Sequence, residues 1–414
     1  MAIRKKAETV STAGGEKTRG ARSRETMRRA PAPVDADETC VLVLQGGGAL
    51  GSYQAGVFER MAARSIQPHW VAGVSIGAIN AALVAGNPPE RRLARLREFW
   101  ERVTSQLSVL TWPSGVGDEA REILNETRAA FAASFGVPGF FTPRIPSALL
   151  QRPGTLAALS IYDTTPLAAT LDELVDFDLI NDLRSPHHVR LSVGAVDVRT
   201  GNYRYFDSDD RESCGGALDA RHVMASGALP PGFPPVEIDG EFYWDGGVVS
   251  NTPLQYVIDQ PRIRNTLVIQ VDLFHARGPL PENLMEVAER QKDIRFASRT
   301  RANTTHAIEA HALGAAARRL AARLPASFSD DPDLKLLLAA GSPAALTILH
   351  LIYRSKHHES QSKDYEFSRQ SMLERWAAGA ADADLSFEHA RWRERPRRGA
   401  NVTVLDLTPR LDAR

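Results

Sequence analysis

The stretch that decides the fold is Cys40-Val-Leu-Val-Leu-Gln-Gly-Gly-Gly-Ala-Leu-Gly51, where a short apolar run meets a turn rich in glycine. A continuous apolar run bounded by glycine is typical of a strand buried on both faces, as in a parallel sheet covered by helices. After the turn, apolar residues recur at helical spacing over residues 53–61. The segment therefore predicts a strand, a glycine turn and a helix in succession.

A second unit of the same kind follows directly. Trp70-Val-Ala-Gly-Val74 predicts another short buried strand, and the chain then turns through Ser75-Ile-Gly77 into the small-residue helix Ala78–Ala85. Because strands alternate with helices, the sequence predicts an α/β fold. Further strands are expected at residues 189–198, 202–206, 236–238, 241–244, 266–273, 346–353 and 402–407.

Composition limits the classes of protein to which this chain can belong. Of its 414 residues, 43% are hydrophobic and 24% are charged, so a large core is expected. The formal net charge of zero argues against a nucleic-acid partner, since such binding depends on many phosphate contacts. The two cysteines, Cys40 and Cys214, are far apart and lack metal-ligand spacing, which argues against disulfides and thiolate metal sites.

The N-terminal residues 1–37 read as a disordered basic tail. Residues 1–30 carry nine Lys or Arg and three Asp or Glu, a net charge of +6. No apolar run of about 7–15 residues precedes Cys40, so a secretory signal is not expected. The alternative to a solvated tail is a handle for anionic lipid surfaces, where each basic residue adds about 1 kcal/mol.

One later stretch, residues 336–353, is apolar enough to suggest a membrane span. Gly341-Ser342-Pro343 interrupts it, and this tripeptide is typical of a turn. A helix end followed by a buried strand is therefore expected instead. The sequence predicts a cytoplasmic protein, with peripheral membrane contact left open.

The glycine turn admits two interpretations. Gly46, Gly48 and Gly51 match the G-x-G-x-x-G pattern of dinucleotide-binding proteins. That pattern also needs an acidic residue about 20 positions later, and residues 65–73 contain none. The other interpretation is an oxyanion hole, because backbone N–H groups at a helix N-terminus carry partial positive charge.

Two further motifs supply a nucleophile and a base. Gly73-Val-Ser-Ile-Gly77 is a G-x-S-x-G sequence between a strand and a helix, the context of a nucleophile elbow. The alternative is that Ser75 only caps the helix. Asp245-Gly-Gly247 follows a predicted strand and places a carboxylate where it can face a partner, although Asp-Gly is also common in plain turns.

Together these motifs resemble those of the patatin-like phospholipases. The resemblance rests on Gly46–Gly51, Gly73–Gly77 and Asp245–Gly247, and on Ala225–Val236 before the last motif. It covers about residues 40–275. It implies a three-layer α/β sandwich with a mostly parallel central sheet, and a serine that is acylated by an ester substrate.

The resemblance also implies roles for individual residues. Ser75 corresponds to the nucleophile and Asp245 to the general base, a dyad that needs no metal or cofactor. The oxyanion hole corresponds to Gly46, Gly47, Gly48 and Ala49, and the supporting glycines are Gly51, Gly73, Gly77, Gly246 and Gly247. Members of the family often carry Arg or Lys just before the last glycine of the first motif, where this chain has Leu50.

The expected organisation has three parts. The tail (residues 1–37) precedes a catalytic domain (38–275) that contains a lid-like insertion at about 90–190. Within that insertion, residues 131–146 are apolar and rich in turns, which predicts either an acyl-chain wall or ordinary core. Residues 276–414 are expected to be mainly helical with late strands. Their segment 364–376 is similar to an uncharacterised extension of some bacterial patatin-like proteins.

The sequence thus predicts a serine-dependent lipid acyl hydrolase, a phospholipase A or carboxylic ester hydrolase. Its expected partner is a lipid or another acyl ester, and its oligomeric state stays open. Alternatives are a hydrolase of a non-phospholipid ester such as a hydroxyacid oligomer, a nucleotide-binding protein and a catalytically silent lipid-binding adaptor. A Ser–His–Asp triad with His275 as base and Asp197 to orient it is a further alternative. His306, Glu309 and His311 lack the spacing of a zinc motif.

Overall fold

The computed structural model describes residue 34 and residues 37–408, apart from 107–116, 261–263, 340–341, 343, 356–358, 360–361 and 398–401. The basic tail expected at residues 1–37 therefore lies almost wholly outside the described residues, as do Gly341 and Pro343. The described residues belong to the unit Pro33–Arg414.

The apolar runs of the sequence form one central sheet. Among the described residues it has nine strands in the order β11-β10-β9-β1-β2-β5-β8-β7, with β6 beside β5. The six strands from β11 to β5 are parallel, and β6, β7 and β8 are antiparallel to their neighbours. The strands are β1 (Glu38–Leu44), β2 (Trp70–Gly73), β5 (Arg190–Asp197), β6 (Tyr203–Asp207), β7 (Val236–Ile238), β8 (Glu241–Asp245), β9 (Asn265–Asp272), β10 (Leu346–Ile352) and β11 (Val402–Asp406).

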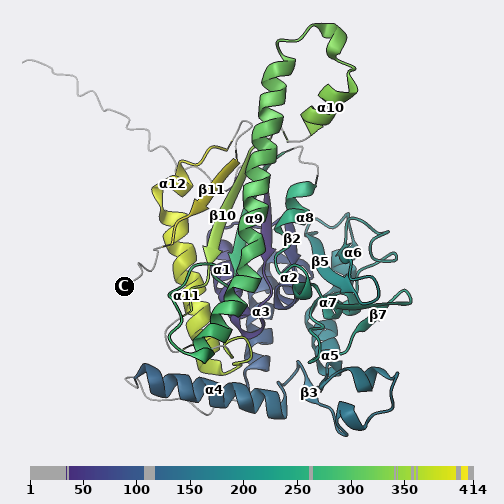
Figure 1. The fold of residues 1–414 in the computed structure, drawn as a ribbon, viewed down its shortest axis with the longest axis vertical. Helices are drawn as coiled ribbons and strands as arrows, with labels where there is room; N and C mark the ends of the chain where they lie inside the picture. Colours follow the sequence, from purple (N-terminus) through teal and green to yellow (C-terminus); the bar gives the residue numbers. More distant parts are fainter. Residues whose placement is uncertain are drawn as a thin grey trace, which may run out of the picture. The chain divides into compact units, whose positions relative to one another are not determined.

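Helices cover both faces of this sheet, which confirms the expected three-layer α/β architecture (Figure 1). Alternate residues of β1 point to opposite faces: Leu42 and Leu44 pack with side chains of α1, α2 and α11, whereas Val41 and Val43 pack with α8. A two-stranded sheet, β3 (Thr142–Pro143) with β4 (Tyr162–Asp163), lies apart. The helices are α1 (Ser52–Ala63), α2 (Ile76–Ala85), α3 (Pro89–Val103), α4 (Asp118–Phe135), α5 (Thr165–Leu174), α6 (Phe177–Asn181), α7 (Ala220–Ser226), α8 (Leu254–Asp259), α9 (Leu284–Ala321), α10 (Pro332–Ala339), α11 (Arg369–Glu388) and α12 (Ala390–Arg393).

The C-terminal region is largely helical, as expected, but it also completes the central sheet. The sequence predicted a domain boundary after residue 275. In the structure, β10 beyond that boundary pairs with β9 before it, and β11 pairs with β10. The apolar stretch at residues 336–353 forms the end of α10 and then β10, so the prediction of a helix end and a strand is confirmed. No helix within the described ranges is long and apolar enough to cross a membrane.

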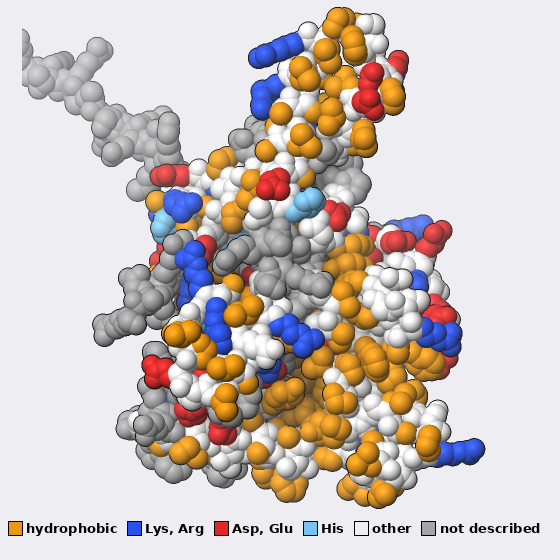
Figure 2. Space-filling view, in the orientation of Figure 1, with side chains coloured by type: hydrophobic (Ala, Val, Ile, Leu, Met, Phe, Trp, Pro, Cys, Tyr) orange, Lys and Arg blue, Asp and Glu red, His pale blue; other side chains and the backbone are white. Residues whose placement is uncertain are grey.

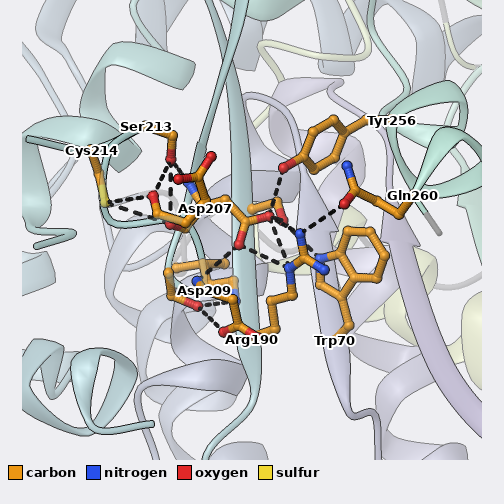
Figure 3. A network of polar contacts seen from close by, with 12 residues as sticks. Trp70, Arg190, Asp207, Asp209, Ser213, Cys214, Tyr256 and Gln260 are labelled. Carbon is orange, nitrogen blue, oxygen red and sulfur yellow. Dashed lines mark hydrogen bonds and ion pairs between the residues drawn. The ribbon is translucent and has the colours of Figure 1, made fainter. Parts of the chain in front are cut away.

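A buried polar network joins the first residues of β2 and β5 (Figure 3). The Arg190 guanidinium donates to Asp207 at 2.8 Å and lies 4.1 Å from the ring centre of Trp70. The hydroxyls of Ser192 and Tyr256 also donate to Asp207, at 2.6 and 2.8 Å. Burial alone would raise the pKa of the Asp207 carboxyl, but the hydrogen bonds and charge of Arg190 lower it below its ordinary value. The network therefore holds β2, β5, β6 and α8 in a fixed register.

Helices α1 and α11 approach each other at two glycines. A Cβ added at Gly56 would lie 1.9 Å from the carbonyl oxygen of Trp376, and one at Gly379 would lie 2.0 Å from that of Tyr53. The Tyr53 hydroxyl also donates to Asp382 of α11 at 2.8 Å. Because no side chain fits at either glycine, the two helices are in backbone contact.

We expect Gly379→Ala to lower the free energy of unfolding by about 1–3 kcal/mol, because the added methyl group forces α1 and α11 apart. Chemical unfolding monitored by circular dichroism measures this change. Gly227→Ala is the control, since a Cβ there would meet its nearest atom at 3.8 Å. Equal stability of the two variants would show that the helices separate without cost.

Candidate active site

Ser75 lies in a strained turn between β2 and α2. Its backbone angles, φ 56° and ψ −127°, are ones that residues with a side chain rarely adopt. Such a conformation costs on the order of 1–3 kcal/mol and needs support from its surroundings. A Cβ at Gly73 would lie 2.3 Å from the Gly77 carbonyl oxygen, and one at Gly77 would lie 2.4 Å from that of Leu44. The two glycines of the motif are therefore required by the tightness of the turn.

Asp245 ends β8 with a buried side chain that is 1% exposed. Its carboxylate accepts a hydrogen bond from the Gly247 N–H at 2.7 Å. Burial raises the pKa of Asp245 to about 7, and the nearby Ser75 side chain and the Gly247 N–H oppose that rise. The structure thus brings the predicted serine and carboxylate close together.

The two residues meet because β2 and β8 share one edge of β5. Val193 pairs with both β2 and β6, so these two strands flank opposite edges of β5. Ala195 pairs with both β6 and β8, so β8 lies on the same edge as β2. The strands run in opposite directions and their C-terminal ends meet at Gly194. Ser75, just past β2, and Asp245, the last residue of β8, are therefore neighbours.

Ser226 ties these two strand ends together and was not singled out from the sequence. The Ser75 N–H donates to both the carbonyl and the hydroxyl oxygen of Ser226, at 3.1 Å each. The Ser226 hydroxyl in turn donates to the Gly194 carbonyl at 2.7 Å. The Asp245 N–H donates to Ala228, two residues further on, at 3.0 Å. The only signal in the sequence was that Ser226 lies in the stretch Ala225–Val236.

The predicted oxyanion loop lies beside the serine. A Cβ at Gly46 would be 3.0 Å from the Cβ of Ser75. At one end of the loop the Gly46 N–H donates to the Asn251 carbonyl at 3.1 Å, and at the other end the Ala49 N–H donates to the Asp364 carbonyl at 2.9 Å. No described residue accepts a hydrogen bond from the Gly47 or Gly48 N–H. Of the four predicted amides, these two are half-buried and remain unused by the protein itself.

Asn251 is a second residue that the sequence reasoning missed. Its side-chain amide donates to the Gly46 carbonyl at 2.9 Å. A Cβ added at Gly46 would lie 2.3 Å from Asn251 Oδ1, and one at Gly247 would lie 2.9 Å from the same atom. Asn251 therefore fills the space between the glycine loop and the aspartate loop. Asn251 lies six residues after Asp245 and just before Thr252-Pro253. A polar residue so close to the aspartate motif could have been chosen as a candidate site residue from the sequence.

The alternative triad does not form in the structure. His275 Nε2 lies 3.9 Å from Asp293, and no ion pair or hydrogen bond is found between the described side chains of His275 and Asp197. Asp197 instead accepts hydrogen bonds from the N–H groups of Arg199 and Thr200 in the turn after β5. Within the described part of the chain, no three His, Cys, Asp or Glu side chains form a group suited to a metal ion.

The apolar segment 131–146 contributes a cluster of aromatic rings to the core. Phe140 and Phe141 are 7% and 4% exposed. Phe140 packs against Phe233 and Phe367, with ring centres 5.8 Å apart in both pairs. Phe141 packs against Phe233 at 5.2 Å. These two phenylalanines therefore form core, which was one of the two expectations for this segment.

Several known proteins are similar to this chain. VipD of Legionella pneumophila aligns over 83% of this chain and 67% of its own, with 16% identity and a TM-score of 0.33. Human GIVD cytosolic phospholipase A2 aligns over 63% of this chain and 48% of its own, with 11% identity and a TM-score of 0.34. A Caenorhabditis elegans protein named for a patatin-like phospholipase domain is 32% identical over 77 residues. That stretch is 17% of this chain and 7% of the length of the curated relative.

Two family models match as well. One, described as patatin phospholipase, matches residues 294–399 in the C-terminal region. The other, described as patatin-like phospholipase, matches residues 42–258, which include Ser75, Asp245 and the glycine loop. Since this second match spans more than half of the 414 residues, the chain belongs to the patatin-like phospholipase family.

Proposed function

We propose that this protein is a serine-dependent lipid acyl hydrolase that cleaves carboxylic esters with Ser75 as nucleophile and Asp245 as general base. The observation that carries the proposal is the buried Asp245 carboxylate beside Ser75, whose pKa burial raises to about 7. A general base acts best when its pKa lies near the working pH. Family membership supports the lipid as substrate class.

The proposed reaction has two steps. Ser75 Oγ attacks the ester carbonyl carbon while its proton passes to Asp245. The negative charge that develops on the carbonyl oxygen is stabilised by the N–H groups of Gly47 and Gly48. Collapse of this intermediate expels the alcohol, which takes the proton from Asp245. Asp245 then accepts a proton from water as that water attacks the acyl-serine. Collapse of the second intermediate breaks the bond to Ser75 Oγ, which takes the proton back from Asp245, and the fatty acid leaves.

A lipid surface is the proposed site of encounter with the substrate. Large apolar side chains on the loop between β3 and β4 face solvent, and Figure 2 shows hydrophobic side chains gathered over this part of the molecule. Ile145, Leu149 and Leu150 are 94%, 95% and 78% exposed. An exposed apolar cluster of this kind is typical of a docking site for a protein or a membrane. The exposed Arg152 within the loop suits anionic headgroups.

This loop adjoins the candidate active site. Ile161 and Tyr162, at its end, donate backbone hydrogen bonds to Pro231 and Gly232 at 3.1 and 2.9 Å. The segment containing those two residues begins at Ala228, whose carbonyl accepts the Asp245 N–H. A membrane bound by the loop would therefore lie near the dyad, so peripheral membrane contact is part of the proposal.

Ser75→Ala and Asp245→Asn are each expected to reduce hydrolysis about 1000-fold or more, because the nucleophile and its base act as one unit. Chromogenic esters of increasing chain length and phospholipid vesicles, assayed with wild type and both variants, test this. Ser134→Ala and Asp178→Asn, on exposed positions of α4 and α6, are matched controls that should keep full activity. If the wild-type protein binds vesicles but hydrolyses no ester, a catalytically silent lipid-binding adaptor would be favoured. If it hydrolyses only hydroxyacid oligomers, its substrate would be a non-phospholipid ester.

The pH profile of kcat/KM should rise through about pH 7. Asp245 must be ionised to accept the serine proton, and burial raises its pKa to about 7. Below about pH 7 the protonated form of Asp245 prevails, so kcat/KM should fall about tenfold per pH unit. Above about pH 7 the carboxylate is ionised, and kcat/KM should reach a plateau. Assays of a soluble short-chain ester from about pH 5 to about pH 9 measure this. An inflection near pH 4, the ordinary range of aspartate, would show that burial does not control the base.

Replacing Leu149 and Leu150 together by Ser should weaken hydrolysis of vesicles about tenfold or more while a soluble short-chain ester is cleaved at the normal rate. The reason is that each buried leucine adds about 1.5–3 kcal/mol to membrane binding. Vesicle co-sedimentation with the same variant measures binding directly. Leu336→Ser, a 72% exposed leucine on α10, is the control. Equal loss on both substrates would contradict a docking role.

A further inference from the structure

The segment Lys363–Ser368, which we call the strap, lies directly on the oxyanion loop. The Ala49 N–H donates to the Asp364 carbonyl at 2.9 Å. A Cβ added at Gly48, whose φ is +55°, would lie 2.3 Å from the same carbonyl oxygen. The contact is therefore between backbones, and it joins the C-terminal region to the loop beside Ser75.

Buried charges hold the backbone of the strap. The Lys363 ammonium contacts Glu289 at 2.8 Å and Asp293 at 2.9 Å, both on α9. The Arg375 guanidinium of α11 donates to the carbonyls of Lys363 and Glu366 at 3.0 and 3.1 Å. The side chains of Lys363 and Arg375 are 0% and 2% exposed. Buried charges persist only where they are paired and hydrogen-bonded, so these contacts fix the course of the strap.

Lys292 of α9 anchors the strap at the residue that touches the loop. Its ammonium lies 2.5 Å from Asp364 Oδ1 and 5.1 Å from the ring centre of Tyr365. The side chains of Lys292 and Asp364 are 21% and 11% exposed, so solvent screens this pair only in part. The loop itself carries no charge, and its Leu50 is fully buried. The cation that pairs with Asp364 thus comes from α9.

The strap accepts one backbone N–H group of the loop and leaves others without an acceptor in the described part of the chain. Asn251 accepts the Gly46 N–H and Asp364 accepts the Ala49 N–H, so the loop is held at both ends. Between them, the Gly47 and Gly48 N–H groups have no acceptor among the described residues. An oxyanion hole works only if its donors are fixed in place before the reaction, and a shift of about 1 Å can cost roughly 100-fold in rate.

We propose that Lys292 and Asp364 are positioning residues for the hydrolysis proposed above, on which this inference rests. By holding the Asp364 carbonyl on the Ala49 N–H, the ion pair aligns the Gly47 and Gly48 amides with the developing oxyanion. Neither side chain touches the reacting atoms. The C-terminal region therefore takes part in catalysis through the backbone of the strap.

Lys292→Met and Asp364→Asn test the proposal. Each should lower kcat about tenfold on a soluble short-chain ester and leave KM unchanged, because the oxyanion forms after the substrate binds. The rate at which a fluorophosphonate modifies Ser75, followed by intact mass, should fall by the same factor. Lys292→Arg should retain most of the activity, and the double variant should be no slower than either single one.

The control is Asp384→Asn. This change removes ion pairs of 3.2 Å with Arg60 and 2.6 Å with Arg64, which also join α1 to α11 but do not touch the loop. It should leave kcat and the modification rate unaltered, and melting curves of all variants should match the wild type. Variants at Lys292 and Asp364 with normal kcat and normal modification rate would overturn the positioning role. Wild type that neither cleaves esters nor reacts with the fluorophosphonate would instead overturn the proposed function, and this inference with it.

Discussion

The candidate active site is formed where two strands, β2 and β8, pair with the same edge of β5. That edge pairs first with β2 along Arg190–Val193 and then with β8 along Ala195–Asp197, so two antiparallel strands end against each other at Gly194. Everything at the site depends on the register of these pairings. A slip by one residue would turn each side chain to the other face of the sheet. The network around Asp207 holds this register from the opposite end of β5, since it joins the first residues of β2 and β5 to β6 and α8.

The site combines two unfavourable features that its surroundings offset. Ser75 has a backbone conformation with positive φ, and Asp245 is a carboxylate removed from water. Ser226 satisfies the Ser75 N–H, and the Gly247 N–H satisfies one oxygen of Asp245. Strain and burial of this kind concentrate at functional sites, where they prepare groups for reaction. Here the positive φ lies at Ser75, and burial raises the pKa of Asp245 to about 7.

The C-terminal region is part of the same structural unit as the residues before it. β10 and β11 extend the sheet from β9, α11 is in backbone contact with α1, and the strap meets the glycine loop after β1. The last two contacts bring backbone atoms together at Gly56, Gly379 and Gly48, where a Cβ would not fit. Through the strap, the ion pair between Lys292 of α9 and Asp364 is connected to the Ala49 N–H of the loop after β1.

The α/β class, the parallel strands and the two motifs around Ser75 and Asp245 could be predicted from the amino-acid sequence. Each of these follows from short-range patterns: apolar runs, glycines where the backbone is crowded, and the hairpin at Asp239-Gly240, whose positive φ angles the structure confirms. Strand pairing and packing in three dimensions bring β2 and β8 to one edge of β5, join the motifs through Asn251 and Ser226, and place the Asp364 carbonyl on the Ala49 N–H. The hydrogen bonds of Ser226, Asn251 and Asp364 connect residues from 32 positions apart (Ser226 and Gly194) to 315 positions apart (Ala49 and Asp364, 364 − 49). No local pattern encodes them, because they arise from strand pairing and from the packing of the completed sheet.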